Sequence, residues 1–85
     1  MVKEILVVVK GKPTYERWTI YQWLLNNKDF LENKYNVVIK VEVREGDNKY
    51  PCIIVGKYII EEPPFEEGYV LEVVDSILSR ILNKN

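Results

Sequence analysis

Few side chains in this sequence of 85 residues could carry out covalent chemistry, and the single thiol of Cys52 is the foremost of them. The sequence contains no histidine, so imidazole acid–base catalysis and a histidine-ligated zinc site are both excluded. Ser76 and Ser79 fall on the expected outer side of the last helix, without a plausible base in the sequence to activate either hydroxyl. We therefore predict that the protein is not an enzyme and that it holds neither a cofactor nor a metal ion.

Cys52 follows Pro51 directly and begins an apolar run of two isoleucines and a valine. A lone cysteine in such a run usually packs as a small hydrophobic residue, so we predict that its side chain is buried. One cysteine cannot form an internal disulfide, which agrees with a reducing compartment. The alternative hypothesis is a redox or thiol-binding role in which Cys52 acts as a single thiol.

The first half of the chain is predicted to form a strand, a helix and a second strand. Residues 5–9 are a continuous apolar run, typical of a central strand that is covered on both faces. Thr14 is expected to cap a helix that runs to about Asn27, or on to Leu31. Residues 37–44 alternate between valine or isoleucine and residues that become charged, so one face of this strand should be apolar and the other should meet water.

The second half is predicted to form a hairpin and a final helix. Two short apolar runs, Cys52–Val55 and Tyr58–Ile60, flank the turn sequence Gly56-Lys57. Pro63 and Pro64 cannot donate hydrogen bonds to a strand ladder, so the hairpin must end before them. The last helix should begin near Glu66 and pack an apolar stripe on the sheet. The stripe consists of Val70, Leu71, Val74, Ile77, Leu78, Ile81 and Leu82.

The sequence Tyr50-Pro51, the hairpin after it and the terminal helix resemble the cis-proline hairpin of the thioredoxin and glutaredoxin superfamily, most of all its small archaeal glutaredoxin-like members. The resemblance implies a single thioredoxin-like α/β domain over residues 1–85, with the element order β-α-β-β-β-α. It implies a four-stranded mixed sheet in the order 2-1-3-4, with two helices mainly on one face. It also implies that the Tyr50–Pro51 peptide bond is cis.

Two departures from the superfamily bear on function. Residues 11–15 contain no thiol, although the superfamily carries its Cys-x-x-Cys pair in this loop. Only residues 46–49 separate the second strand from Tyr50, where the family usually inserts another helix. If that helix normally covers the opposite face of the sheet, the face should be polar here, and Lys40, Glu42 and Arg44 agree with this.

Composition excludes several classes of partner. The 12 basic and 13 acidic residues give a net charge of −1 and are spread along the chain, so nucleic acid is not an expected partner. No apolar run approaches the roughly 20 residues of a membrane span, and residues 1–11 lack the features of a signal peptide. We expect a soluble cytoplasmic protein. The abundance of Ile, Val, Glu, Lys and Tyr, with no alanine, is a bias associated with thermophiles.

The first helix carries two aromatic residues on opposite sides. A helical wheel places Trp18 on the same broad arc as Ile20 and Leu24, and places Trp23 nearly opposite, together with Phe30. Exposed aromatic residues two turns apart are typical of an interface. The alternative is that the helix ends at Asn26-Asn27 and that Phe30 folds back beneath the domain.

These observations favour a redox-inactive, thioredoxin-like module for protein binding or oligomerisation, and a homodimer in particular. Tyr50, Pro51, Trp23 and Phe30 are the candidate residues for contacting a peptide or a partner protein. A monothiol protein that uses Cys52, or a structural subunit of a larger assembly, are the alternative hypotheses.

Overall fold

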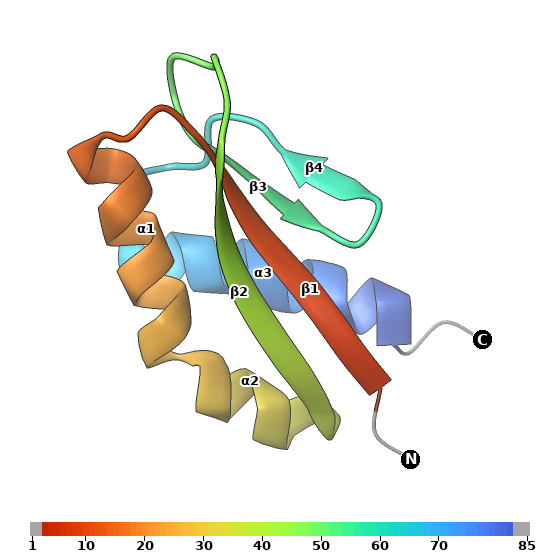
Figure 1. The fold of residues 1–85 in the computed structure, drawn as a ribbon. Helices are drawn as coiled ribbons and strands as arrows, with labels where there is room; N and C mark the ends of the chain where they lie inside the picture. The colour runs from red at the N-terminus through yellow and green to blue at the C-terminus, as the bar shows by residue number, and fades with distance from the viewer. Residues whose placement is uncertain (1–2, 83–85) are drawn as a thin grey trace.

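The computed structural model describes residues 3–82, which form a four-stranded sheet and three helices (Figure 1). In chain order the elements are β1 (Lys3–Gly11), α1 (Tyr15–Asn26), α2 (Lys28–Tyr35), β2 (Val37–Glu45), β3 (Cys52–Val55), β4 (Tyr58–Ile60) and α3 (Glu67–Leu82). The bounds of β3 and β4 are those predicted from the sequence. The prediction of two helices is wrong, because α2 is a separate helix.

The sheet is mixed, and its strands lie in the order β2-β1-β3-β4, as predicted. β1 and β2 are parallel, with Val7 opposite Val41. β3 runs antiparallel to β1, and β4 pairs with β3 in a hairpin whose turn contains Gly56 at a φ of 60°. Glycine adopts this left-handed conformation without the steric cost that a Cβ atom would bring.

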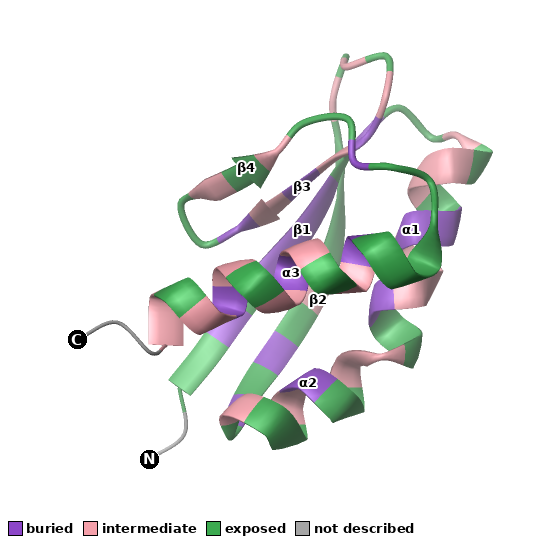
Figure 2. Cartoon of the chain, turned by 180° about the vertical axis from the view of Figure 1, so that it is seen from behind, coloured by how far each residue is buried: buried purple, intermediate pink, exposed green. Residues whose placement is uncertain are grey.

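All three helices lie on the same side of the sheet and enclose the core between the two layers (Figures 1 and 2). Alternate strand residues supply the sheet side of this core, because successive side chains of a strand point to opposite faces. Each fully buried Val, Leu or Ile contributes about 1.5–3 kcal/mol of transfer free energy. The core consists of Ile5, Val7, Val9, Ile20, Leu24, Leu31, Val37, Ile39, Ile53, Val55, Val70, Val74 and Leu78.

The other face of the sheet, here called the open face, is covered by no helix of residues 3–82 (Figure 1). Lys40, Glu42 and Arg44 are exposed there, which confirms that the outer side of β2 meets water. The prediction that residues 5–9 are covered on both faces is wrong at Leu6, which is exposed. Val8 is the exception on this side of β1, since it is only 2% exposed between Glu42 and Ile54 in the register.

The ends of α1 follow from side-chain hydrogen bonds. The Arg17 backbone N–H donates to the Thr14 hydroxyl at 3.2 Å, which confirms Thr14 as the N-cap. At the other end, the Asn27 side-chain amide donates to the Trp23 carbonyl at 2.8 Å and to the Glu67 carboxylate at 3.0 Å. The Trp23 carbonyl also accepts the Asn27 backbone N–H at 3.2 Å, so Asn27 binds the end of α1 twice and links it to α3, and α2 begins with Lys28.

The loop between β2 and β3 differs from the expectation drawn from the thioredoxin resemblance. The Tyr50–Pro51 peptide bond is trans, so the prediction of a cis bond is wrong. The Asn48 side-chain amide shapes this loop instead, because it donates to the Lys10 carbonyl at 2.9 Å and to the Tyr50 carbonyl at 2.7 Å. Cys52 is half-buried rather than buried, since it lies opposite Lys10 on the uncovered side of the sheet.

Candidate functional site

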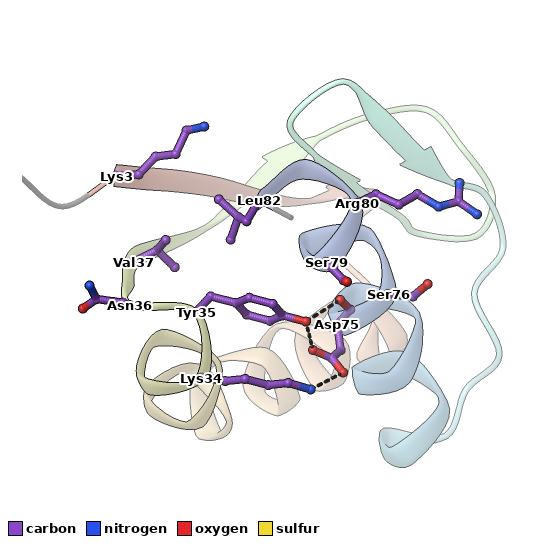
Figure 3. A pocket seen from close by; sticks show the side chains of 10 residues that line it. All are labelled: Lys3, Lys34, Tyr35, Asn36, Val37, Asp75, Ser76, Ser79, Arg80 and Leu82. Carbon is purple, nitrogen blue, oxygen red and sulfur yellow. Dashed lines mark hydrogen bonds and ion pairs between the residues drawn. The ribbon is translucent and has the colours of Figure 1, made fainter. Parts of the chain in front are cut away.

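A polar groove of about 820 Å³ lies between the C-terminal half of α3 and the chain that leads from α2 into β2 (Figure 3). Three side chains form a connected cluster in it. The Lys34 ammonium lies 2.9 Å from one oxygen of Asp75, and the Tyr35 hydroxyl donates to the other oxygen at 2.6 Å. Ser76, Ser79 and Arg80 of α3 also line the groove.

The end of α2 positions this cluster. Asn36 adopts the left-handed conformation, with φ 55° and ψ 52°, and its backbone N–H donates to the Glu32 carbonyl. Asparagine tolerates this conformation better than most residues, so it ends the helix and turns the chain into β2. The turn leaves Lys34 and Tyr35 in the last turn of α2, with both side chains pointing towards Asp75 of α3 (Figure 3).

The three charged or polar groups shift one another's protonation. Partial burial raises the pKa of Tyr35 above its ordinary value of 10.0, and the hydrogen bond to the Asp75 carboxylate raises it further. Partial burial would raise the pKa of Asp75, but hydrogen bonds from Tyr35 and Lys34 outweigh this, and the pKa is lowered below 3.8. The hydrogen bond to Asp75 raises the pKa of Lys34. At neutral pH the cluster therefore holds a phenol, a carboxylate and an ammonium.

This arrangement stabilises the packing of two helices more than it prepares a reaction. The Asp75 carboxylate already accepts from two donors, so it is not a free base. The hydroxyls of Ser76 and Ser79 have no imidazole in the sequence to activate them. Among residues 3–82 no group of three or more Cys, Asp or Glu side chains is arranged to hold a metal ion. The groove can accommodate a polar molecule, but it supplies no nucleophile.

A second candidate site is an aromatic cluster on the outer side of α1. The Tyr15 and Trp18 rings are stacked with centroids 6.4 Å apart, and Phe65 lies 6.3 Å from Tyr15 in an edge-on arrangement. Trp23 packs beneath Phe65, with ring centroids 5.0 Å apart. Tyr15 is 69% exposed, Trp18 57% and Phe65 43%, and we call these three residues the aromatic surface.

The aromatic surface overturns the predicted orientation of α1. Trp18 was expected in the core and is exposed, whereas Trp23 was expected to face outward and is half-buried against the core. The buried side of α1 is centred on Thr19, Ile20 and Leu24, because α3 and the segment before it cover the flank that carries Trp23.

Phe30 is 61% exposed, as expected of an outward residue, and it lies on α2 rather than on the same helix as Trp23. The alternative hypothesis is half correct, since the first helix does end at Asn26, but Phe30 does not fold beneath the domain.

The structure does not bring the predicted partner-binding residues into one surface. Pro51 is buried beneath Gly11, where a Cβ atom on the glycine would lie 3.0 Å from the Pro51 Cα. Tyr50 is half-buried and lines a small cavity together with Cys52. Trp23 lies at the contact of α1 with the segment before α3, and Phe30 lies on α2.

Sequence reasoning missed both clusters that the fold assembles. Tyr35 and Asp75 are 40 residues apart, so no local pattern pointed to their contact. The aromatic surface did have a signal, because Tyr15 and Trp18 are three residues apart on a helix and therefore adjacent.

No protein-family model matches the sequence, and no curated protein matches it. The helices of residues 3–82 are all too short or too polar to cross a membrane.

Proposed function

We propose that this chain is a redox-inactive protein-binding module and that its partner contacts the aromatic surface of Tyr15, Trp18 and Phe65. The observation that carries the proposal is the exposure of three large aromatic side chains that already contact one another. Trp and Tyr are enriched at the centres of protein interfaces, where they bury a large area.

The packing of these rings favours recognition of a macromolecule. Tyr15 stacks on Trp18, and Phe65 is held between Tyr15 and the half-buried Trp23. Rings that are fixed in the free protein lose little conformational freedom when a partner binds, so more of the contact energy becomes affinity. Monomeric proteins rarely expose a large contiguous apolar patch without a use for it.

The redox part of the proposal follows from the thiol content. Exchange between a dithiol and a disulfide needs an attacking and a resolving thiol, and this chain has one cysteine. We also propose that the fold is thioredoxin-like. The strand order and the antiparallel hairpin support this proposal, while the trans Tyr50–Pro51 bond counts against it.

One matched pair of variants tests the binding surface. A partner is first recovered from an extract of the source organism with the wild-type chain and purified, and its affinity is measured by calorimetry. Trp18→Ser should weaken binding by about thirtyfold, equivalent to about 2 kcal/mol for a central anchor. Phe30→Ser removes an aromatic side chain of similar exposure from α2 and should leave the affinity within twofold.

Equal affinities for the wild type and Trp18→Ser would refute this placement of the binding surface. Thermal unfolding of both variants provides the control for folding, because both side chains are mostly exposed and both substitutions should change stability little. Trp23→Ala serves a different purpose. Its ring packs against the core and Phe65, so its loss should destabilise the monomer.

A monothiol role for Cys52 is the alternative function, and one observation favours it. The thiol is half-buried rather than enclosed, and it lines a cavity of about 180 Å³ with Asn48, Tyr50, Glu61 and Glu62. A small thiol compound could therefore reach the sulfur. Exchange of the Cys52 thiol with oxidised glutathione, which forms a mixed disulfide and releases one reduced glutathione, should then occur on the native wild type and not on Cys52→Ser.

A further inference from the structure

The outer edge of β2 offers backbone groups to a further strand. β2 is an edge strand of the sheet, and among residues 3–82 it pairs with β1 alone (Figure 1). The Ile39 N–H points away from β1, because it donates to the Glu32 carboxylate at 2.7 Å, whereas the Gly46 N–H donates to the Gly11 carbonyl of β1. The backbone N–H and C=O groups of successive strand residues point alternately to the two sides of the strand. Val41, Val43 and Glu45 therefore direct these groups away from β1, as Ile39 does.

Only the C-terminal half of this edge is open. Glu32 of α2 occupies the Ile39 N–H and thereby covers the first half of the strand. At the opposite edge of the sheet, β4 is three residues long and is followed shortly by Pro63 and Pro64, which cannot extend a ladder. Exposed edge strands of natural proteins are usually short, covered, interrupted by proline or charged. Residues 41–45 contain no proline, and their protection is the charge of Glu42, Arg44 and Glu45.

The charges on this half of β2 are complementary to a second copy of themselves. Glu42 and Arg44 are exposed on the open face, and within one chain the Arg44 guanidinium lies 3.3 Å from the Glu42 carboxylate. In an antiparallel pair centred on Val43, Glu42 of each chain faces Arg44 of the other. Such directly opposed residues have Cβ atoms about 5 Å apart, and opposite charges there are stabilising. A parallel, in-register pair would instead align like charges.

The backbone selects the same register. Centring the pair on Val43 joins Val43 to its counterpart and Val41 to Glu45, and all of these residues have outward polar groups. Centring it on Val41 would also oppose unlike charges, but it would need the Ile39 N–H, which Glu32 already holds. Val43 is 38% exposed, so the pairing also removes apolar surface from water.

The helix layer fits this arrangement. α1 packs beneath β1 and β2, and its flank with Trp23 faces the segment before α3. Tyr21 and Leu25, two residues on either side of Trp23, lie on the opposite flank, on the side of β2. Two such helices, each beneath its own β1–β2 pair, would lie about 10 Å apart across the junction, which is the ordinary packing distance of helices.

We infer that a second copy of this chain pairs antiparallel with the edge of β2 around Val43 and makes one continuous sheet through both copies. The inference goes beyond the proposed function, because residues 41–45 carry it and the aromatic surface takes no part.

Sedimentation of the full chain over a range of concentrations tests this pairing. The wild type should be a dimer that dissociates on dilution. Glu42→Arg and Arg44→Glu should each weaken dimerisation by about tenfold, because each places like charges opposite one another twice. An equimolar mixture of the two variants should dimerise as tightly as the wild type, since each chain then faces the opposite charges. The double variant with both Glu42→Arg and Arg44→Glu should also dimerise as tightly as the wild type, because opposite charges face each other again.

Val43→Pro removes one outward N–H without removing a hydrogen bond to β1, so it should give a folded monomer. Trp18→Ser should leave the dimer unchanged, which separates this interface from the aromatic surface. A wild type that stays monomeric at millimolar concentration would overturn the inference. So would a dimer that survives Val43→Pro, or charge variants that do not restore each other when mixed.

Discussion

Replacing Tyr35 with phenylalanine removes one hydroxyl and its contacts with Asp75, while the ring that packs against the core remains. Hydrogen bonds to charged groups contribute about 1.5–3 kcal/mol to stability. The Asp75 side chain is 30% exposed to solvent, so water screens part of this interaction. We therefore expect Tyr35→Phe to lower the free energy of unfolding by about 1–2 kcal/mol. In a domain of this size each kcal/mol lowers Tm by roughly 4–8 °C.

Urea unfolding followed by circular dichroism measures this loss. Tyr69→Phe is the matched control, because Tyr69 is a tyrosine of α3 that is 49% exposed. Asp75→Asn and the double variant complete a mutant cycle, whose coupling energy should exceed about 0.5 kcal/mol for residues in contact. Equal effects of Tyr35→Phe and Tyr69→Phe, or a coupling energy near zero, would refute the reasoning.

The pH dependence supplies an independent check. The pKa of Asp75 is lower in the folded state than its ordinary 3.8, so the carboxylate stabilises the fold above that pH. This contribution should disappear as the pH falls through the lowered pKa. The pKa of Tyr35 is raised above 10.0, so the phenol stabilises the fold below pH 10 and this contribution is lost above it. Tyr35→Phe should reduce the loss of stability at both extremes.

Three further predictions concern backbone, core and thiol. Gly68→Ala should stabilise the protein by up to about 1 kcal/mol, because an added Cβ in α3 meets no atom within 4 Å. Gly56→Ala should destabilise it by about 1–2 kcal/mol, because Gly56 has a positive φ. Chemical denaturation of the two variants measures whether the free energy of unfolding rises in the first and falls in the second. Thr19→Val should stabilise the protein by about 1 kcal/mol, because it replaces a buried hydroxyl that has no hydrogen-bond partner with a methyl group; a lower Tm would contradict this. The wild type should not accelerate the reduction of insulin by dithiothreitol, and acceleration that depends on Cys52 would contradict the redox-inactive proposal.

The strands were predictable because their signals are local. Residues 52–55 and 58–60 are short apolar runs around a glycine turn, and their bounds agree with the structure. The alternation along residues 37–44 also predicted which side of β2 meets water. In each case the apolar run marks the position of the strand, although Val43 and Ile59 are apolar and exposed.

The helices were harder, because their surroundings come from distant parts of the chain. A helical wheel assigned Trp18 to the core and Trp23 to solvent, but Phe65 lies over Trp23, 42 positions later in the sequence. The break at Asn27 depends on a side-chain hydrogen bond to Glu67, which is 40 residues away. Neither contact has a local signature, so the orientation of α1 and the start of α2 could not be placed from the sequence, although the spacing of Tyr15 and Trp18 did indicate that these two rings are adjacent.

The one-sided helix layer affects how this protein can change over evolution. In β1 and β2 the interior and the open face are carried by alternate residues, so a substitution at Leu6 or Glu42 leaves Val7 and Val41 in place. A descendant could exchange the charge or hydrophobicity of that whole surface while keeping the same interior. A sheet with helices on both faces has no such freedom, because nearly every strand residue is interior. Val8 marks the limit of this freedom, because it is the point on the open side of β1 where neighbouring side chains already exclude water.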